Sequence, residues 1–259
     1  MPPVTAPQSS SAAPAAPSTA SSTAQTGAIF TLEGVGKRFG YRAALEDLSL
    51  AVPPGAFTLL LGSNGAGKTT LLKLLSTLMR PSSGRILFRG AALPAAALAA
   101  RRDLGMISHD SRLYPDLTAR ENLRIFGRLY AVAGLPARIA EALAEVRLDD
   151  VADVPVRNYS SGMLKRLSIA RLQLYGPRVL LLDEPYSGLD QASIGLLDDY
   201  LTRFRDGGGT TVMVTHQFTA GVALTTQALV LHRGKLVYNQ AAQGLTPARC
   251  AELLQETAR

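Results

Sequence analysis

The sequence predicts an α/β domain with a mostly parallel core sheet and an inserted block of helices. Short apolar runs, typical of strands buried on both faces, alternate with segments of helical pattern. A stretch from about residue 112 to residue 173 is mostly helical in pattern and interrupts the strands. The 259 residues are enough for one large domain, and the apolar fraction of 47% is that of a packed core.

The N-terminal segment differs in composition from the rest. Residues 1–27 are almost entirely Ala, Pro, Ser and Thr, and they contain no charged residue. Such a segment cannot bury enough apolar surface to offset the entropy of ordering it, so we expect a flexible tail. It also lacks the basic and apolar regions of a secretory signal. We expect the folded domain at residues 28–259, with a helical subdomain at about 110–175.

Apolar runs bounded by turn residues predict the strands. In chain order they are Ile29–Leu32, Leu48–Val52, Phe57–Leu61, Arg85–Phe88, Val179–Leu182, Thr211–Val214 and Leu229–Leu231. A hairpin is expected to turn at Arg233-Gly234-Lys235, after the last of these strands.

Helical periodicity and stop signals predict five helices between the strands. They are Thr69–Leu78, Thr118–Tyr130, Pro136–Val146, Ser161–Tyr175 and Pro247–Thr257. The second has the clearest start, because Thr118 and Glu121 have the spacing of a capping box. Strands separated by helices imply a mostly parallel sheet.

The strongest chemical signal is the loop between the strand at 57–61 and the helix after it. It reads Gly62-Ser63-Asn64-Gly65-Ala66-Gly67-Lys68-Thr69, which matches the P-loop pattern in full. Glycines let successive N–H groups turn toward phosphate, and the helix N-terminus adds its positive dipole end. We expect Lys68 to reach the β- and γ-phosphates of ATP, Thr69 to ligate Mg²⁺, and Thr70 to line the same cradle. A glycine-rich turn that binds nothing is the alternative, and the strand–loop–helix order argues against it.

A second chemical signal follows the strand at 179–182, where an apolar run meets two adjacent carboxylates. Side chains alternate along a strand, so Asp183 and Glu184 should point in different directions. We assign Asp183 to Mg²⁺, through water, and Glu184 to the attacking water. Taken alone, the pair is equally well explained as an acidic strand end that faces solvent.

Further motifs resemble those of ABC ATPases, over about residues 29–240. Asn158-Tyr159-Ser160-Ser161-Gly162-Met163 resembles the family signature, usually Leu-Ser-Gly-Gly-Gln. Ser187-Gly188-Leu189-Asp190 looks like the family's D-loop, and Thr215-His216 looks like its switch histidine. Phe39 is similar to the aromatic residue that stacks on adenine. In isolation Phe39 and His216 would more often be core residues, but the order and spacing of all six motifs agree.

The resemblance implies a fold, a mechanism and partners. The fold would be a P-loop NTPase with an N-terminal antiparallel β subdomain and an inserted α-helical subdomain. Similar proteins pair head to tail, so Ser160 and Gly162 would face the γ-phosphate across the interface. His216 would contact the same phosphate, and Asp190 would link the two sites. The family implies ATP hydrolysis with Mg²⁺, a second ATPase subunit (identical or not), and membrane-spanning permease subunits. The chain would then be peripheral, on the cytoplasmic face of the cell membrane.

The sequence departs from the family pattern at two places. His109 stands where the family usually has a glutamine, at the hinge between the core and the helical block, and imidazole titrates near neutral pH. In the signature, Ser161 replaces a glycine and Met163 replaces the glutamine, which puts the efficiency of hydrolysis in doubt. These features, with Asp183-Glu184-Pro185-Tyr186, look most like the haem-exporter ATPase subunits of cytochrome c biogenesis. Nothing in the chain itself is recognisable as a contact to haem.

Composition leaves two other functions open. The net charge of +7 and the pI of about 9.8 would suit a soluble ABC ATPase that acts on nucleic acid or ribosomes. Because the basic residues are scattered and only one cassette is present, we expect no nucleic-acid partner. A binding module that has lost hydrolysis is the other alternative, and the intact Lys68, Asp183 and Glu184 argue against it. No apolar run reaches about 18 residues, so a membrane role requires a partner.

Overall fold

The computed structural model describes residues 27–108, 110–216, 221–242 and 245–258. The expected tail at residues 1–27 therefore lies outside the described residues, apart from Gly27, and so does His109. Within the described ranges no helix is long and apolar enough to cross a membrane.

Two sheets form the body of the molecule. The first is antiparallel, in the order β2-β1-β4-β5, and is built from β1 (Phe30–Phe39), β2 (Arg42–Val52), β4 (Ser83–Phe88) and β5 (Ala91–Ala92). The second has the order β10-β9-β3-β8-β7-β6. Its strands are β3 (Phe57–Leu61), β6 (Leu104–Ile107), β7 (Val179–Asp183), β8 (Thr210–Val214), β9 (Gln227–His232) and β10 (Lys235–Ala241). They pair in parallel except for β10 on β9, which confirms the predicted mostly parallel core and the antiparallel sheet near the N-terminus.

The central strands read as unbroken apolar runs because both faces of the second sheet are covered. Along β7, Leu180 and Leu182 pack into one core, while Val179 and Leu181 pack into the other. One core is shared with α1 (Lys68–Leu75) and the antiparallel sheet. The other is shared with α5 (Ser161–Tyr175) and α6 (Gln191–Asp206). This double burial is the reason for the pattern at 179–182.

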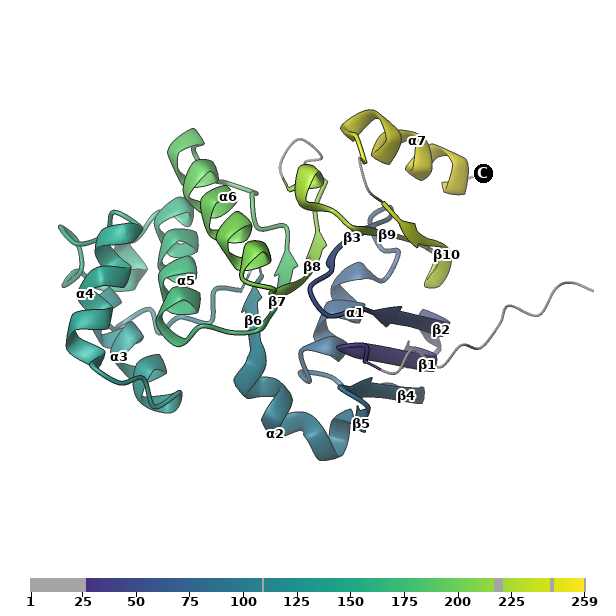
Figure 1. Cartoon of the computed structure of the whole chain (residues 1–259), viewed down its shortest axis with the longest axis horizontal. Helices are drawn as coiled ribbons and strands as arrows, with labels where there is room; N and C mark the ends of the chain where they lie inside the picture. The colour runs from purple at the N-terminus through teal and green to yellow at the C-terminus, as the bar shows by residue number, and fades with distance from the viewer. Residues whose placement is uncertain (1–26, 109, 217–220, 243–244, 259) are drawn as a thin grey trace, which may run out of the picture.

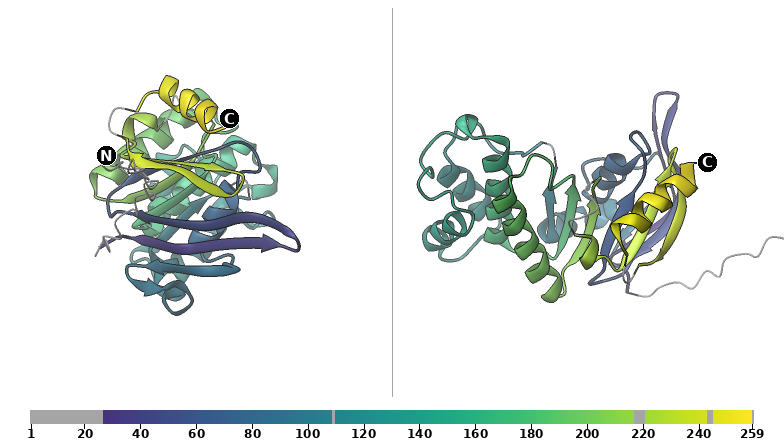
Figure 2. Two further views of the ribbon diagram at one scale, coloured as in Figure 1. Left: turned by 90° about the vertical axis from the view of Figure 1, so that its right-hand side faces the viewer. Right: turned by 90° about the horizontal axis from the view of Figure 1, so that it is seen from above.

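The helices α3 (Ala119–Leu129), α4 (Leu135–Glu145) and α5 gather at one end of the molecule, away from β1, β2 and β4 (Figure 1). Figure 2 shows the same separation from above, with the antiparallel sheet and β10 at the opposite end. The capping box at the start of α3 is confirmed: the Thr118 hydroxyl accepts from the Glu121 N–H at 3.1 Å, and the Glu121 carboxylate accepts from the Thr118 N–H at 2.8 Å.

Several elements differ from the prediction. The first helix ends at Leu75, because Ser76 already caps it. The prediction omitted α2 (Leu93–Asp103), β6 and α6. In α2 an alanine-rich composition hides the helical period, and Pro94 lies in the first turn, where its missing N–H has no cost. The last helix is α7 (Pro247–Ala258), close to the predicted span.

Candidate functional site

The glycine-rich loop connects β3 to α1 and needs glycine for steric reasons. Gly67 is the N-cap of α1 with φ 107°, a conformation that side chains rarely adopt. A Cβ added there would lie 2.5 Å from Leu45 Cδ2 and 2.6 Å from the Ala44 carbonyl oxygen. A Cβ on Gly62, at φ 150°, would collide with the Leu231 carbonyl. The loop is therefore held tightly by β2 and β9, with its N–H groups at a helix N-terminus, where an anion is favoured.

The ammonium of Lys68 lies inside this loop. Its Nζ donates to the carbonyl of Gly62 at 2.7 Å and to that of Ser63 at 3.0 Å, and the residue is only 7% exposed. Burial lowers the pKa of Lys68, while the charges of Glu184 and Asp183 act in the opposite direction. A buried cation at a helix N-terminus provides a strong local attraction for phosphate.

Thr69 and Asp183 meet although 114 positions separate them. The Thr69 hydroxyl donates to Asp183 Oδ2 at 2.8 Å, and Asp183 is 3% exposed at the end of β7. A hydroxyl and a carboxylate oxygen are hard ligands, and Mg²⁺ is usually bound by one or two protein oxygens together with phosphates and waters. Among the described residues no group of three or more His, Cys, Asp or Glu side chains could hold a metal by itself. The pair therefore fits Mg²⁺ brought in with a nucleotide.

Asp183 and Glu184 have different partners, Thr69 and His216 respectively, although both line the same cleft. Strand β7 ends at Asp183, and Glu184 has φ 50°, a left-handed conformation that costs a non-glycine residue about 1–3 kcal/mol. Its carboxylate accepts from the His216 N–H at 3.2 Å, and its Oε1 lies 3.4 Å from His216 Nε2. The turn at Glu184, rather than the alternation of side chains along a strand, therefore places the Glu184 carboxylate beside His216. His216 is half exposed, so it is not a core histidine.

Most of the predicted nucleotide and catalytic residues line one cleft of about 810 Å³, but Gly62, Ser63 and Ala66 of the loop do not. Phe39, at the end of β1, is 49% exposed on its wall and is not a core aromatic. The cleft also includes Ser187, from the D-loop-like motif, and three residues that were not predicted as site residues, namely Arg42, Ala44 and Val214. Arg42 is exposed, and within the described ranges its guanidinium makes no ion pair or side-chain hydrogen bond. Arg42 could have been predicted from the sequence, because it lies three residues after Phe39 in a basic turn. All the lining residues are Phe39, Arg42, Ala44, Asn64, Gly65, Gly67, Lys68, Thr69, Thr70, Asp183, Glu184, Ser187, Val214 and His216.

The signature-like residues lie outside this cleft. Ser160 is exposed and is the N-cap of α5, accepting from the Met163 N–H at 3.3 Å. Gly162 follows in the first turn, and a Cβ there would approach the Gly188 carbonyl at 3.7 Å. Asp190 caps α6 through the Ser193 N–H at 2.8 Å, and hydrogen bonding from Ser193 lowers the Asp190 pKa. None of Ser160, Gly162 and Asp190 is among the residues that line the P-loop cleft.

The histidine predicted to lie at a hinge, His109, is outside the described residues, but residues on both sides of it are held by a buried cation. Arg171, on α5, is 5% exposed and donates to the carbonyls of Met106 and Ser111, each at 3.0 Å. Its guanidinium also lies 4.9 Å from the ring centroid of Phe126 on α3. Arg171 thus fixes both sides of the hinge to the helical block.

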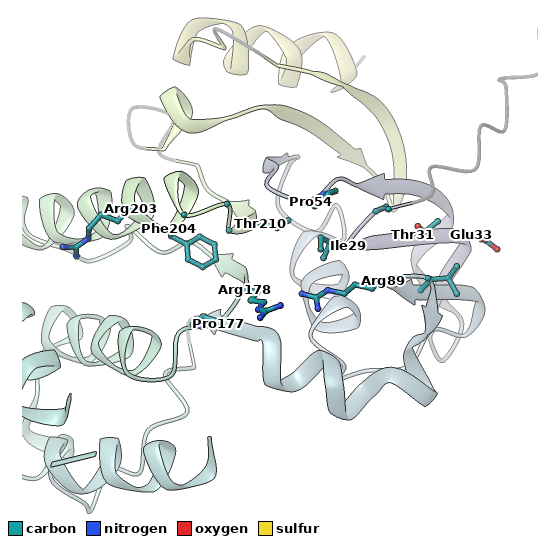
Figure 3. Close-up of a pocket in the computed structure, with 17 residues that line it drawn as sticks. Ile29, Thr31, Glu33, Pro54, Arg89, Pro177, Arg178, Arg203, Phe204 and Thr210 are labelled. Carbon is teal, nitrogen blue, oxygen red and sulfur yellow. The ribbon is translucent and has the colours of Figure 1, made fainter. Parts of the chain in front are cut away.

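A larger hollow, of about 1040 Å³, lies elsewhere (Figure 3). It is lined by residues where β7 and β8 begin, Arg178 and Thr210, together with Arg89 and Phe204. Arg89 is paired with Asp103 at 2.8 Å. None of the predicted site residues lines it, so size does not identify the functional site here. Most of the predicted catalytic and binding residues lie in the P-loop cleft, at the opposite ends of β7 and β8.

Comparison with known proteins agrees with this geometry. Residues 45–187 match the ABC transporter family. The chain is 36% identical to the Nod factor export ATP-binding protein I of Cupriavidus metallidurans, over 81% of this chain and 70% of that protein. It is 42% identical to a daunorubicin resistance ATP-binding protein of Streptomyces coeruleorubidus, over 73% of this chain and 60% of that one.

A solved dimeric ATP-binding cassette bound to ADP and phosphate has the same fold. Its TM-score is 0.75 at 24% identity, covering 83% of this chain and all of that one. The chain spans 60% to 70% of the length of the two relatives named above. With the fold, the cleft and these matches in agreement, the chain belongs to the ABC transporter family as an ATP-binding ATPase subunit.

Proposed function

We propose that this chain hydrolyses Mg²⁺-bound ATP in the P-loop cleft and thereby energises export through separate membrane-spanning subunits. The observation that carries the proposal is the convergence of Lys68, Thr69, Asp183, Glu184 and His216 on one cleft from three separate parts of the chain. A buried lysine, a metal-binding oxygen pair and a carboxylate next to an imidazole are the groups that phosphoryl transfer to water requires.

Each group has a separate role in this proposal. The loop N–H groups and Lys68 would bind the phosphates, and Phe39 would stack on the adenine. Thr69 and Asp183 would hold Mg²⁺, whose charge would offset the negative charge of the phosphates. The Glu184 carboxylate orients the attacking water and accepts its proton. His216 lies beside that carboxylate, where an Nε2 proton donor would contact the γ-phosphate.

A second subunit would complete the site. Ser160 and Gly162 lie at the exposed N-terminus of α5, where an anion is favoured, and yet they do not line the cleft of their own chain. A head-to-tail pair would bring them onto the partner's γ-phosphate, and Asp190 beside them would link the two cleft regions. The similar solved cassette is a dimer, which supports this arrangement.

The names of the relatives support export as the direction of transport. One is named for Nod factor export and one for daunorubicin resistance, so a transported organic molecule is the best supported cargo class. Neither name refers to haem or to nucleic acid, so the haem-export hypothesis and the nucleic-acid alternative have no support from these relatives. The chain would work peripherally, at the cytoplasmic face of the membrane.

The variant Glu184→Gln tests the chemical part. Glutamine keeps the size and the acceptor for the His216 N–H but cannot accept a proton, so hydrolysis should fall by about 10²–10⁴-fold while ATP stays bound. Steady-state hydrolysis, ATP affinity and ATP-dependent dimerisation by light scattering would be measured. Glu141→Gln, on the exposed face of α4, is the matched control. Hydrolysis by Glu184→Gln at the wild-type rate would refute the role of Glu184.

Affinity purification tests the transport part. Glu184→Gln with ATP and Mg²⁺ would be used to hold the closed state in gently solubilised membranes. Recovery of a multi-span membrane protein in a fixed ratio is expected, and its genomic context would name the cargo. Recovery of ribosomes or nucleic acid without a membrane protein would contradict the transporter proposal.

A further inference from the structure

Lys165 lies on α5, five residues after the Ser160 N-cap, and makes an unusual set of contacts. Its Nζ donates to the carbonyl of Glu184 at 2.8 Å, to that of Pro185 at 3.2 Å, and also to that of Ser187. An ammonium has three N–H donors, so all of them are used on the main chain of one loop. That loop follows β7 and carries the proposed catalytic carboxylate.

The charge of Lys165 is held without a carboxylate partner. Within the described ranges it forms no ion pair, and the side chain is half-buried. Burial lowers the pKa of Lys165, and the charge of Glu184 offsets part of this effect. A lysine that only stabilised a surface would be expected to keep its head in water. Here the head of a half-buried side chain binds three carbonyls.

The backbone that Lys165 contacts is the strained one. Glu184 has φ 50°, and such a conformation persists only where the surroundings fix it from several sides. The Glu184 N–H donates to the Val214 carbonyl at 2.9 Å, which secures the residue to β8. Its carboxylate accepts from the His216 N–H. The Glu184 carbonyl is the remaining fixed point: it accepts from the Ser187 N–H at 3.3 Å within the same loop, and from Lys165, which holds it to α5.

We propose that Lys165 is a positioning residue for hydrolysis: it clamps the Glu184–Ser187 main chain so that the Glu184 carboxylate stays aimed into the P-loop cleft. The inference rests on the proposed role of Glu184. It adds a group that touches neither nucleotide nor metal and that no part of the P-loop pattern or of the acidic strand end identifies. Without the clamp, the turn at Glu184 relaxes and its carboxylate moves.

The variant Lys165→Met tests the clamp, because methionine has a similar length and no donor. A misplacement of about 1 Å at a reacting group can cost about 100-fold in rate, so kcat for ATP hydrolysis should fall by about 10- to 100-fold. ATP affinity should change less than about threefold, because the P-loop contacts remain. Lys165→Arg keeps a cationic donor and should recover most of kcat. Lys235→Met, which breaks only an exposed pair with Glu46, is the matched control.

A double variant separates positioning from a merely structural role. If Lys165 acts through Glu184, Lys165→Met should reduce the residual single-turnover rate of Glu184→Gln by less than about threefold. Additive losses, or a loss of ATP affinity that matches the loss of kcat, would overturn the clamp. If Glu184→Gln loses ATP hydrolysis but Lys165→Met hydrolyses ATP at the wild-type rate, the clamp alone is refuted. Active Glu184→Gln would refute the assignment of Glu184 itself, and the clamp with it.

Discussion

The tight fit of Gly67 predicts that Gly67→Ala damages both folding and ATP binding. The added methyl would meet Leu45 Cδ2 at 2.5 Å and the Ala44 carbonyl oxygen at 2.6 Å, and the oxygen belongs to the main chain of β2, so it cannot move aside cheaply. The φ of 107° adds a conformational cost of about 1–3 kcal/mol, and overpacking adds about 1–3 kcal/mol. The free energy of unfolding should therefore fall by about 2–6 kcal/mol.

The same cost should appear in nucleotide binding. If the substitution destabilises the phosphate-binding conformation of the loop by about 3 kcal/mol, ATP affinity falls by about 100-fold. Urea unfolding followed by circular dichroism and calorimetric titration with ATP would measure the two effects. Gly134→Ala is the matched control: Gly134 is also a helix N-cap with a left-handed φ, of 60°, but nothing lies within 4 Å of an added Cβ. An unchanged urea midpoint and an ATP affinity within threefold of wild type for Gly67→Ala would refute the reasoning.

Two further substitutions test other parts of the site. Arg42→Ala should weaken ATP binding by about three- to tenfold and make ATP affinity less dependent on salt, because the Arg42 guanidinium at the cleft would contact phosphate. An ATP affinity equal to that of the wild type at low salt would contradict this role. Tyr186→Phe should lower the free energy of unfolding by about 1–2 kcal/mol, because the buried hydroxyl donates to Asp198 Oδ1 at 2.6 Å and ties the Glu184 loop to α6. Thermal unfolding measures it, and an unchanged midpoint would show that the bond contributes nothing.

Much of the site could be read from the sequence because its groups are local. The P-loop works through consecutive residues, and the capping box needs only the Thr118–Glu121 spacing. The helix α6 could also have been predicted, since Ile194, Leu197, Tyr200 and Leu201 keep a helical period after the Asp190 cap. The sequence-based prediction was wrong to omit it. By contrast, the length of β1 depends on pairing with both β2 and β4, which no local pattern encodes.

The family, the P-loop pattern and the acidic pair could all be recognised in the sequence, because they depend on residue types at short, fixed spacings. The groups that meet across long separations became visible in the fold: Thr69 with Asp183, Glu184 with His216, and Lys165 with the loop that carries Glu184. The tertiary structure also replaced strand alternation with a left-handed turn at Glu184. The physical reason is that a strained turn exists only where neighbours from other elements supply its hydrogen bonds, and those neighbours are chosen by the fold.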